Sequence, residues 1–112
     1  MKKIKVKCWV EDEGEKFYGP RPNELLKRIL EEKSLSGAAT KMGMSYKKAW
    51  ELVQRLNQHA EEPLVILKKG GQHGGGAEVT PEGLEIMREF ENLQRKIDEL
   101  VDQQTNLIKV LK

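Results

Sequence analysis

The sequence predicts one mostly helical α+β domain, and three observations lead to this prediction. The chain has 112 residues, of which 38% are hydrophobic, a length and composition suited to a single small core. Apolar residues alternate with lysines over residues 3–11, which is the period of a strand. Over residues 23–33, 45–58 and 80–112 they recur at intervals of three and four, which is the period of a helix.

The N-terminal residues are predicted to form a β-hairpin. The alternation places four residues on one buried face of a strand, namely Ile4, Val6, Cys8 and Val10. An acidic turn over residues 11–14 and the segment to Tyr18 predict a return strand, before Gly19-Pro20-Arg21-Pro22 stops regular structure. Cys8 is interpreted as a small core residue rather than a reactive thiol.

Two helices and a tight turn are predicted next. Asn23 is expected to cap the first helix, which ends near Lys33. A short second helix is expected over Ser36–Met42. Gly43 then turns the chain at a left-handed position, and Ser45 caps the helix that follows.

The helix from Ser45 to about Gln58 is amphipathic. Its apolar positions are Ala49, Leu52, Val53 and Leu56. Tyr46 and Trp50 lie one turn apart, and we expect them to pack beneath the helix, with Trp50 in or near the core.

Two short strands follow, over Leu64–Leu67 and Ala77–Val79, joined by the basic, glycine-rich segment 68–76. Three helices followed by a hairpin is the order of a winged helix-turn-helix. Within this order, the small Ala39, Gly43 and Ala49 stand where the second and third helices must approach closely. The full prediction is therefore a winged helix-turn-helix with an N-terminal β-hairpin and a long C-terminal helix.

The C-terminal helix is predicted to mediate dimerisation. Thr80 caps it, Pro81 occupies its first turn, and apolar residues then form a heptad seam over residues 86–111. The seam consists of Ile86, Phe90, Leu93, Ile97, Leu100, Gln104, Leu107 and Leu111. A continuous helix of this length would extend about 45 Å, too far for one small domain to cover, so a partner helix is expected. Gln104, the one polar residue of the seam, would either fix the register of the pair by bonding its symmetry mate or lie at a solvated position.

Several short strings resemble the DNA-binding domain of ModE-type transcriptional regulators. They are Ser34-Leu35-Ser36-Gly37-Ala38-Ala39, Gly43-Met44-Ser45-Tyr46-Lys47-Lys48-Ala49-Trp50, the glycines of 70–76 and Thr80-Pro81-Glu82-Gly83. The resemblance covers about residues 23–90, and the more distant LysR-type regulators share the order of elements and the Thr80-Pro81-x-Gly83 ending. It implies a winged-helix dimer on operator DNA. ModE continues into molybdate-binding domains that have no counterpart in this sequence, so molybdate sensing is not inferred.

The charge distribution also favours nucleic acid as a partner. Residues 1–79 hold fifteen Lys and Arg against eleven Asp and Glu, whereas residues 80–112 hold five against seven. We therefore expect a DNA-binding domain over 1–79 and a dimerisation helix over 80–112, with no further domain. Double-stranded DNA and a second copy of the chain are the expected partners, and the effector is unknown.

The expected DNA contacts come from the helix-turn-helix and the wing. The start of helix 45–58 would enter the major groove, and the wing over 68–76 would contact phosphates or the minor groove. The candidate residues are Ser36, Thr40, Lys41, Ser45, Tyr46, Lys47, Lys48, Lys68, Lys69, Gln72 and His73.

Other functions have less support in the sequence. The glycine-rich segment lacks the Lys-Ser/Thr that completes a nucleotide-binding loop. One cysteine and two histidines are too few to indicate a metal site or a cofactor. The sequence shows no arrangement of residues typical of nucleophilic catalysis. We therefore expect no enzyme and, from the single cysteine and lack of a signal or membrane segment, a cytoplasmic location. The alternative function is a protein interaction module, in which the heptad helix binds another chain and the winged helix is a scaffold without DNA contact.

Overall fold

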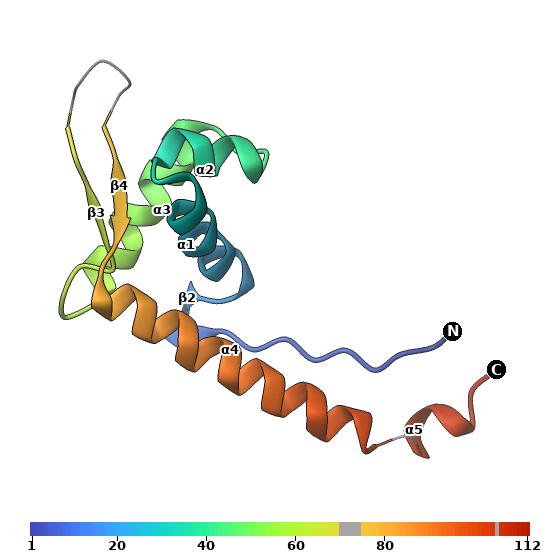
Figure 1. Ribbon diagram of the computed structural model, residues 1–112. Coiled ribbons are helices and arrows are strands. Elements are labelled where there is room, and N and C mark those ends of the chain that lie inside the picture. Colours follow the sequence, from blue (N-terminus) through green and yellow to red (C-terminus); the bar gives the residue numbers. More distant parts are fainter. Residues whose placement is uncertain (70–74, 105) are drawn as a thin grey trace.

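The structure, a computed structural model, describes residues 1–69, 75–104 and 106–112. Three helices form a cluster, α1 (Pro20–Glu32), α2 (Leu35–Lys41) and α3 (Tyr46–His59). Two separate antiparallel strand pairs flank it, β1 (Val10–Asp12) with β2 (Glu15–Tyr18), and β3 (Val65–Leu67) with β4 (Ala77–Val79). Helix α4 (Pro81–Asp102) extends away from the cluster and leads to the short α5 (Asn106–Lys109) (Figure 1). This order confirms the predicted mostly helical winged helix-turn-helix with an N-terminal hairpin.

A single aliphatic core lies where the helices of the cluster meet. Helix α1 contributes Leu25, Leu26 and Ile29, and α3 contributes Val53 and Leu56, all almost completely buried. Burying each such side chain contributes about 1.5–3 kcal/mol relative to leaving it in water, so this apolar cluster is the main source of stability.

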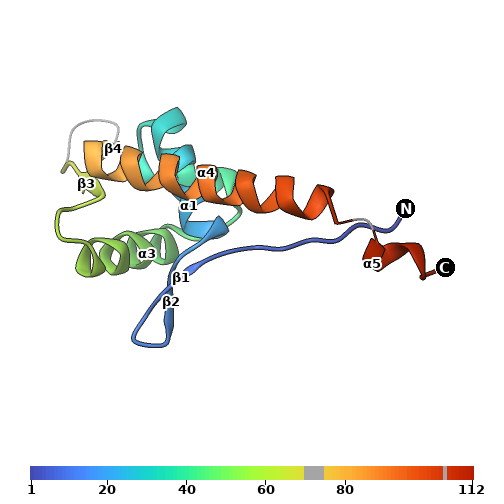
Figure 2. The same ribbon diagram turned by 90° about the horizontal axis from the view of Figure 1, so that it is seen from below.

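The N-terminal hairpin is shorter than the sequence predicts. Residues 1–9 form no strand, Val6 and Val10 are exposed, and Ile4 and Cys8 are only half-buried, so the predicted buried face is wrong. The alternation is that of a strand, but among the described residues no neighbouring strand pairs with residues 1–9. We call residues 1–9 the N-terminal arm; they run extended beside α4 in both views (Figures 1 and 2).

Helix α1 begins earlier than predicted, because its prolines lie inside the first turn. Proline is tolerated there since the first backbone N–H groups of a helix have no partner within the helix. Asn23 is therefore not the cap but a buried residue of the helix. Its Oδ1 accepts a hydrogen bond from the Tyr18 hydroxyl at 2.6 Å, and its Nδ2 donates to Glu91 of α4 at 3.3 Å. This short network, with Tyr18 packed edge-on against Phe90, joins α4 to the cluster.

Helix α4 begins as predicted and ends early. The Thr80 hydroxyl accepts from the Gly83 amide at 3.0 Å, and Pro81 occupies the first turn. The predicted continuous helix to residue 112 is wrong, because α4 ends at Asp102 and is about 33 Å long for its 22 residues. The polar run from Asp102 to Asn106 offers no apolar side chain to bury, and the amide of Gln103 bonds back to the Leu100 carbonyl. In the described ranges, none of the helices has the length and apolarity needed to cross a bilayer.

We expect Gly83→Ala to destabilise the protein. A Cβ atom at residue 83 would lie 2.3 Å from the Leu64 carbonyl oxygen and 2.6 Å from a methyl carbon of Val79, so backbone must move to admit it. The net loss in the free energy of unfolding should be about 1–3 kcal/mol, read from urea denaturation. Gly76→Ala is the matched control, because its Cβ would meet only ordinary van der Waals contact. Equal stability of the two variants would contradict the packing described.

A second prediction concerns Tyr18. Its burial, with a smaller effect of the Glu91 carboxylate, raises the pKa of its hydroxyl above the ordinary value near 10. The unfolded chain therefore loses this proton at lower pH than the folded chain, and the stability that neutral Tyr18 contributes falls as pH rises above about 10, by up to 1.4 kcal/mol per pH unit. Tyr18→Phe should cost about 1–3 kcal/mol at pH 7, and its deficit should shrink between pH 9 and 11. Tyr46→Phe, at an exposed site, should follow the wild-type curve.

Candidate nucleic-acid interface

Helices α2 and α3 cross closely around a tight turn. Ser34 caps α2 by accepting a hydrogen bond from the Gly37 amide at 3.0 Å, and Ala38, Ala39 and Ala49 are buried where the helices meet. Gly43 turns the chain with φ +65°, as predicted, and the Met44 amide bonds back to the Ala39 carbonyl at 3.0 Å. Caps and small side chains thus set the close crossing of the two helices, while Leu35, Val53 and Leu56 anchor them in the apolar core.

The start of α3 is an exposed, positively charged helix end. Ser45 caps it through a hydrogen bond from the Lys48 amide at 3.1 Å, and Tyr46, Lys47 and Lys48 are exposed on its first turn. The exposed Lys41 precedes the turn. A helix N-terminus carries a partial positive charge, so its dipole and these ammonium groups act in the same direction on a nearby phosphate.

Some of the basic side chains form ion pairs within the protein, and those at the start of α3 do not. Ion pairs bind Lys27 to Glu91, Arg55 to Glu15 and Lys68 to Glu78, and further pairs lie along α1 and α4. Among the described residues, by contrast, no ion pair involves Lys41, Lys47, Lys48 or Lys69. These four ammonium groups are available to an external anion.

Two polar residues of α2, Ser36 and Thr40, are also predicted to contact DNA, and their hydroxyl groups differ in their hydrogen bonds. Ser36 is exposed, and no described hydrogen bond engages its hydroxyl. Thr40 is exposed but donates its hydroxyl hydrogen to the Ser36 carbonyl at 3.0 Å, so it could only accept a further hydrogen bond.

The wing is anchored to α3 by one side chain that the sequence analysis did not single out. The Asn57 Oδ1 atom accepts hydrogen bonds from the amides of Leu64 and Val65, and its Nδ2 donates to the Val65 carbonyl at 2.9 Å. Lys68 forms a 2.6 Å ion pair with Glu78 across the wing, whereas Lys69 is exposed. Gln72 and His73, which the sequence also predicts to bind DNA, lie outside the described residues.

Two aromatic side chains of α3 are placed differently from the prediction. Trp50 is 44% exposed and Tyr46 55% exposed, so neither packs beneath the helix and the core assignment of Trp50 is wrong. The core at this level is already filled by Ala49 and Val53, whose positions leave residue 50 on the outer face. Aromatic exposure on a helix in this position was not evident from periodicity alone.

The N-terminal hairpin borders the C-terminal half of α3. Arg55 donates to the Lys16 carbonyl at 2.6 Å and pairs with Glu15 at 3.3 Å, while His59 Nδ1 lies 2.6 Å from an Asp12 carboxylate oxygen. The hairpin therefore engages the basic side chains at this end of α3, and the unpaired cations are confined to its beginning. Sequence periodicity could not reveal this, because the partners are about 40 residues apart.

The residues of the predicted seam divide into three groups. Ile86, Phe90 and Ile97 are half-buried, and Phe90 contacts Tyr18. Leu93 and Leu100 of α4 are 51% and 60% exposed. Beyond the end of α4, Gln104, Leu107 and Leu111 are exposed and do not continue the same helix.

Within the described ranges, no three His, Cys, Asp or Glu side chains come together as metal ligands. The arrangement consists instead of a capped helix-turn-helix with unpaired cations and an adjoining wing. These features define a winged helix-turn-helix domain of the DNA-binding class.

Residues 23–84 match the family described as bacterial regulatory helix-turn-helix protein, lysR family. The chain belongs to this family and contains its helix-turn-helix domain. It is 38% identical over 90 residues to the DNA-binding transcriptional dual regulator ModE of Escherichia coli (strain K12), covering 77% of this chain and 34% of that protein. It is 42% identical over 66 residues to the molybdenum-pterin-binding protein MopA of Rhodobacter capsulatus, covering 59% of this chain and 25% of that protein.

The chain thus spans about a third or less of the length of these relatives. Among solved structures, it is similar to BenM_DBD in a crystal structure of its complex with benA site 1 DNA. The TM-score is 0.55 at 21% identity, with 80% of this chain and 96% of that chain covered. This likeness supports the fold, and the sequence relatives support the regulator family.

Proposed function

We propose that the protein binds specific double-stranded DNA as a homodimer, with the start of α3 in the major groove and the wing on the backbone or in the minor groove. The observation that carries the proposal is the set of cations on α2, α3 and the wing that have no ion-pair partner in the described chain, Lys41, Lys47, Lys48 and Lys69. Phosphate contacts by such groups dominate affinity for DNA.

Base recognition is assigned to the first turns of α3. Tyr46 and Lys47 stand on its exposed face, and a lysine there can donate to guanine acceptors in the major groove. Ser36, Lys41 and Ser45 would contact the phosphate backbone. Thr40 would do so only by giving up its hydrogen bond to the Ser36 carbonyl. Lys68 is paired with Glu78, so Lys69 is the stronger candidate on the wing, and Gln72 and His73 stay predictions.

Dimerisation is assigned to α4. Leu93 and Leu100 stand on its outer face, and their burial against a second copy would gain about 1.5–3 kcal/mol for each fully buried side chain. A dimer brings two such DNA-binding surfaces to one duplex and so doubles the positive charge that faces the DNA. This addition is needed, because a domain with a formal net charge of only +2 binds DNA weakly through bulk charge.

The DNA contacts predict a change in the salt dependence of binding. Lys48→Ala combined with Lys69→Ala should weaken binding to the specific duplex and flatten the slope of log affinity against log salt by about two units, because two phosphate contacts are lost. The measurement is a titration by fluorescence anisotropy at several salt concentrations. Lys109→Ala combined with Lys112→Ala removes the same charge far from α3 and is the control.

An unchanged slope for the Lys48 and Lys69 variant would exclude this geometry. A wild-type protein that shows no salt-sensitive DNA binding would support the alternative function, an interaction module in which the winged helix is a scaffold. Selection of bound sequences from random duplexes would then give the operator and its half-site spacing.

The dimer is tested separately from the DNA contacts. Leu93→Asp combined with Leu100→Asp should give a monomer at micromolar concentration by sedimentation equilibrium, since each change would bury a carboxylate at the interface. Leu84→Asp is the control, because Leu84 is also exposed on α4 but lies about 180° around the helix from Leu93. A wild-type protein that is monomeric at this concentration would refute the homodimer.

A further inference from the structure

A cavity of about 340 Å³ lies between the N-terminal arm, strand β2, the start of α1 and the side of α3 that faces the hairpin, and we call it the hairpin cavity. Its volume is near the lower end of the range for small-molecule sites, about 300–1,000 Å³. Trp9 is 44% exposed, and its indole N–H already donates to Glu11 at 3.0 Å, so its ring can be covered without loss of a hydrogen bond. The apolar and aromatic side chains of the wall include Trp9, Phe17, Tyr18, Pro20, Pro22 and Leu52.

Every charged side chain that lines the hairpin cavity is positive. Arg55 is already paired with Glu15 at 3.3 Å, and the Lys16 ammonium lies 4.0 Å from the centroid of the Trp9 ring. In the described chain, neither Lys7 nor Arg21 has an ion-pair partner. An anion in the cavity would therefore meet two cations for which no carboxylate competes. The lining cations are Lys7, Lys16, Arg21 and Arg55.

The carboxylates of the hairpin are engaged around the cavity rather than in it. Glu11 accepts from the Trp9 indole, and Asp12 contacts His59. Glu15 pairs with Arg55. None of these three carboxylates lines the cavity. Even when Glu11 and Glu15 are counted against the four lining cations, the surroundings of the cavity keep a net positive charge.

The arm is held beside the hairpin cavity by Gln94 of α4. The Gln94 Oε1 atom accepts a hydrogen bond from the Cys8 amide at 3.2 Å, and its Nε2 donates to the Val6 carbonyl at 2.8 Å. The same Nε2 donates to Asp98 at 3.0 Å, which fixes the orientation of the amide. These bonds hold the backbone on both sides of Lys7 before any ligand enters. Preorganisation of this kind lowers the free-energy cost of binding.

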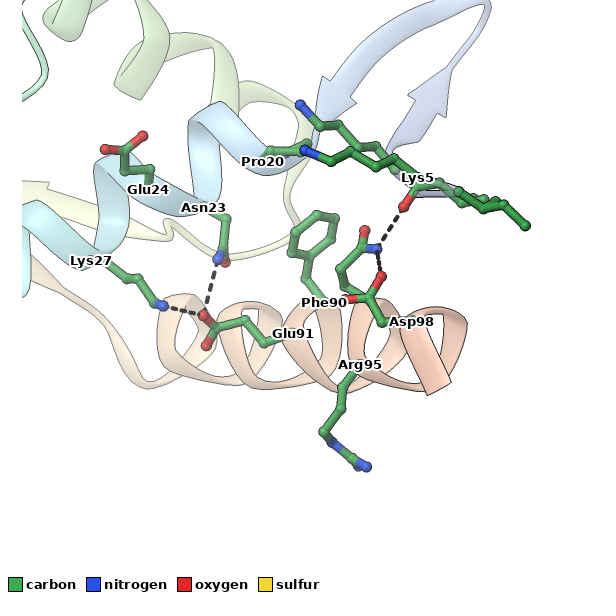
Figure 3. Close-up of a pocket in the computed structure, with 13 residues that line it drawn as sticks. Lys5, Pro20, Asn23, Glu24, Lys27, Phe90, Glu91, Arg95 and Asp98 are labelled. Atoms are coloured by element: carbon green, nitrogen blue, oxygen red, sulfur yellow. Dashed lines mark hydrogen bonds and ion pairs between the residues drawn. The ribbon is translucent and has the colours of Figure 1, made fainter. Parts of the chain in front are cut away.

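A larger cavity on the other side of the arm does not select a ligand by charge. It has a volume of about 670 Å³ and lies between the arm, α1 and α4 (Figure 3). Lys27 and Glu91 form an ion pair at its wall, so each already neutralises the other. Its charged lining is mixed and includes Lys5, Lys27, Arg95, Glu24, Glu91 and Asp98.

We propose that the hairpin cavity binds a small aromatic carboxylate, with its ring against Trp9 and its carboxylate between Lys7 and Arg21. A flat ring covers the aromatic and apolar walls, and a carboxylate accepts charge-assisted hydrogen bonds from ammonium and guanidinium groups. A bare phosphate would leave the apolar walls uncovered, and a neutral ring would leave the cations unused. The site is separate from the proposed DNA contacts, because none of the residues assigned to DNA lines it.

The test is a titration of the isotope-labelled protein with benzoate, without DNA, followed by two-dimensional NMR. Saturable shifts are expected in the amides of residues 16–19, 52 and 55. Benzamide has the same ring without the charge, and inorganic phosphate has charge without the ring. Each should bind at least about 10-fold more weakly than benzoate, because one of the two interactions is lost.

Variants locate the site. Lys7→Gln combined with Arg21→Gln should weaken benzoate binding at least about 10-fold while the other amide resonances stay in place. Lys3→Gln combined with Lys96→Gln removes the same charge outside the hairpin cavity and is the matched control, with unchanged affinity expected.

Four results would overturn the proposal. They are a benzoate titration without saturable shifts, benzamide binding as tight as that of benzoate, phosphate binding as tight as that of benzoate, and an equal loss of affinity in the two double variants. Tight phosphate binding would identify the cavity as a phosphate site instead, such as a contact to the DNA backbone. Because the titration contains no DNA, none of these results decides whether α3 and the wing bind DNA.

Discussion

The junction between the wing and α4 fixes the relative positions of the other functional elements. The Leu64 carbonyl accepts from the Thr80 amide at 3.0 Å, and Gly83 brings the first turn of α4 against the same carbonyl. On its other side, the Leu64 amide donates to Asn57 of α3 at 2.8 Å. One residue at the base of the wing therefore connects α3, the wing and α4 through backbone groups. Because backbone hydrogen bonds at a buried site are costly to break, these three elements move together.

The same structure distributes its charges unevenly. The N-terminal hairpin engages Arg55 and His59 at the far end of α3, and Glu78 engages Lys68 on the wing. Exposed ion pairs of this kind contribute little to stability, about 0–1 kcal/mol each. Their main consequence here is electrostatic, because along α3 they leave only the lysines of its first turn without an ion-pair partner among the described residues. The acidic hairpin would repel a phosphate backbone, and this confines favourable DNA approach to the opposite end of the helix.

The features that sequence analysis predicted correctly depend on neighbours along the chain. Ser45 and Thr80 cap helices through amides three residues away, and Gly43 needs only its own backbone conformation. The features that it missed depend on distant contacts. Asn23 was mistaken for a cap because its partners, Tyr18 and Glu91, come from other elements, and the alternation of the arm could not show that a glutamine 86 residues away replaces a strand. Trp50 was misplaced because hydrophobicity alone does not distinguish an outer aromatic residue from a core one.

A dimer through α4 would make the spacing of the two DNA-reading helices a property of the protein rather than of the DNA. Each α3 is tied to its own α4 through Asn57, Leu64 and the Thr80–Gly83 turn. The Tyr18–Asn23–Glu91 network separately joins β2 and α1, on which α3 packs, to α4. If the two α4 helices pack in one register, the separation of the α3 helices follows from it without any flexible link. The two α3 helices could then contact both half-sites of an operator only when the half-site spacing matches their fixed separation. That spacing is one helical turn of DNA or a multiple of it. A change at the α4 interface would therefore alter DNA recognition without touching any residue that contacts DNA.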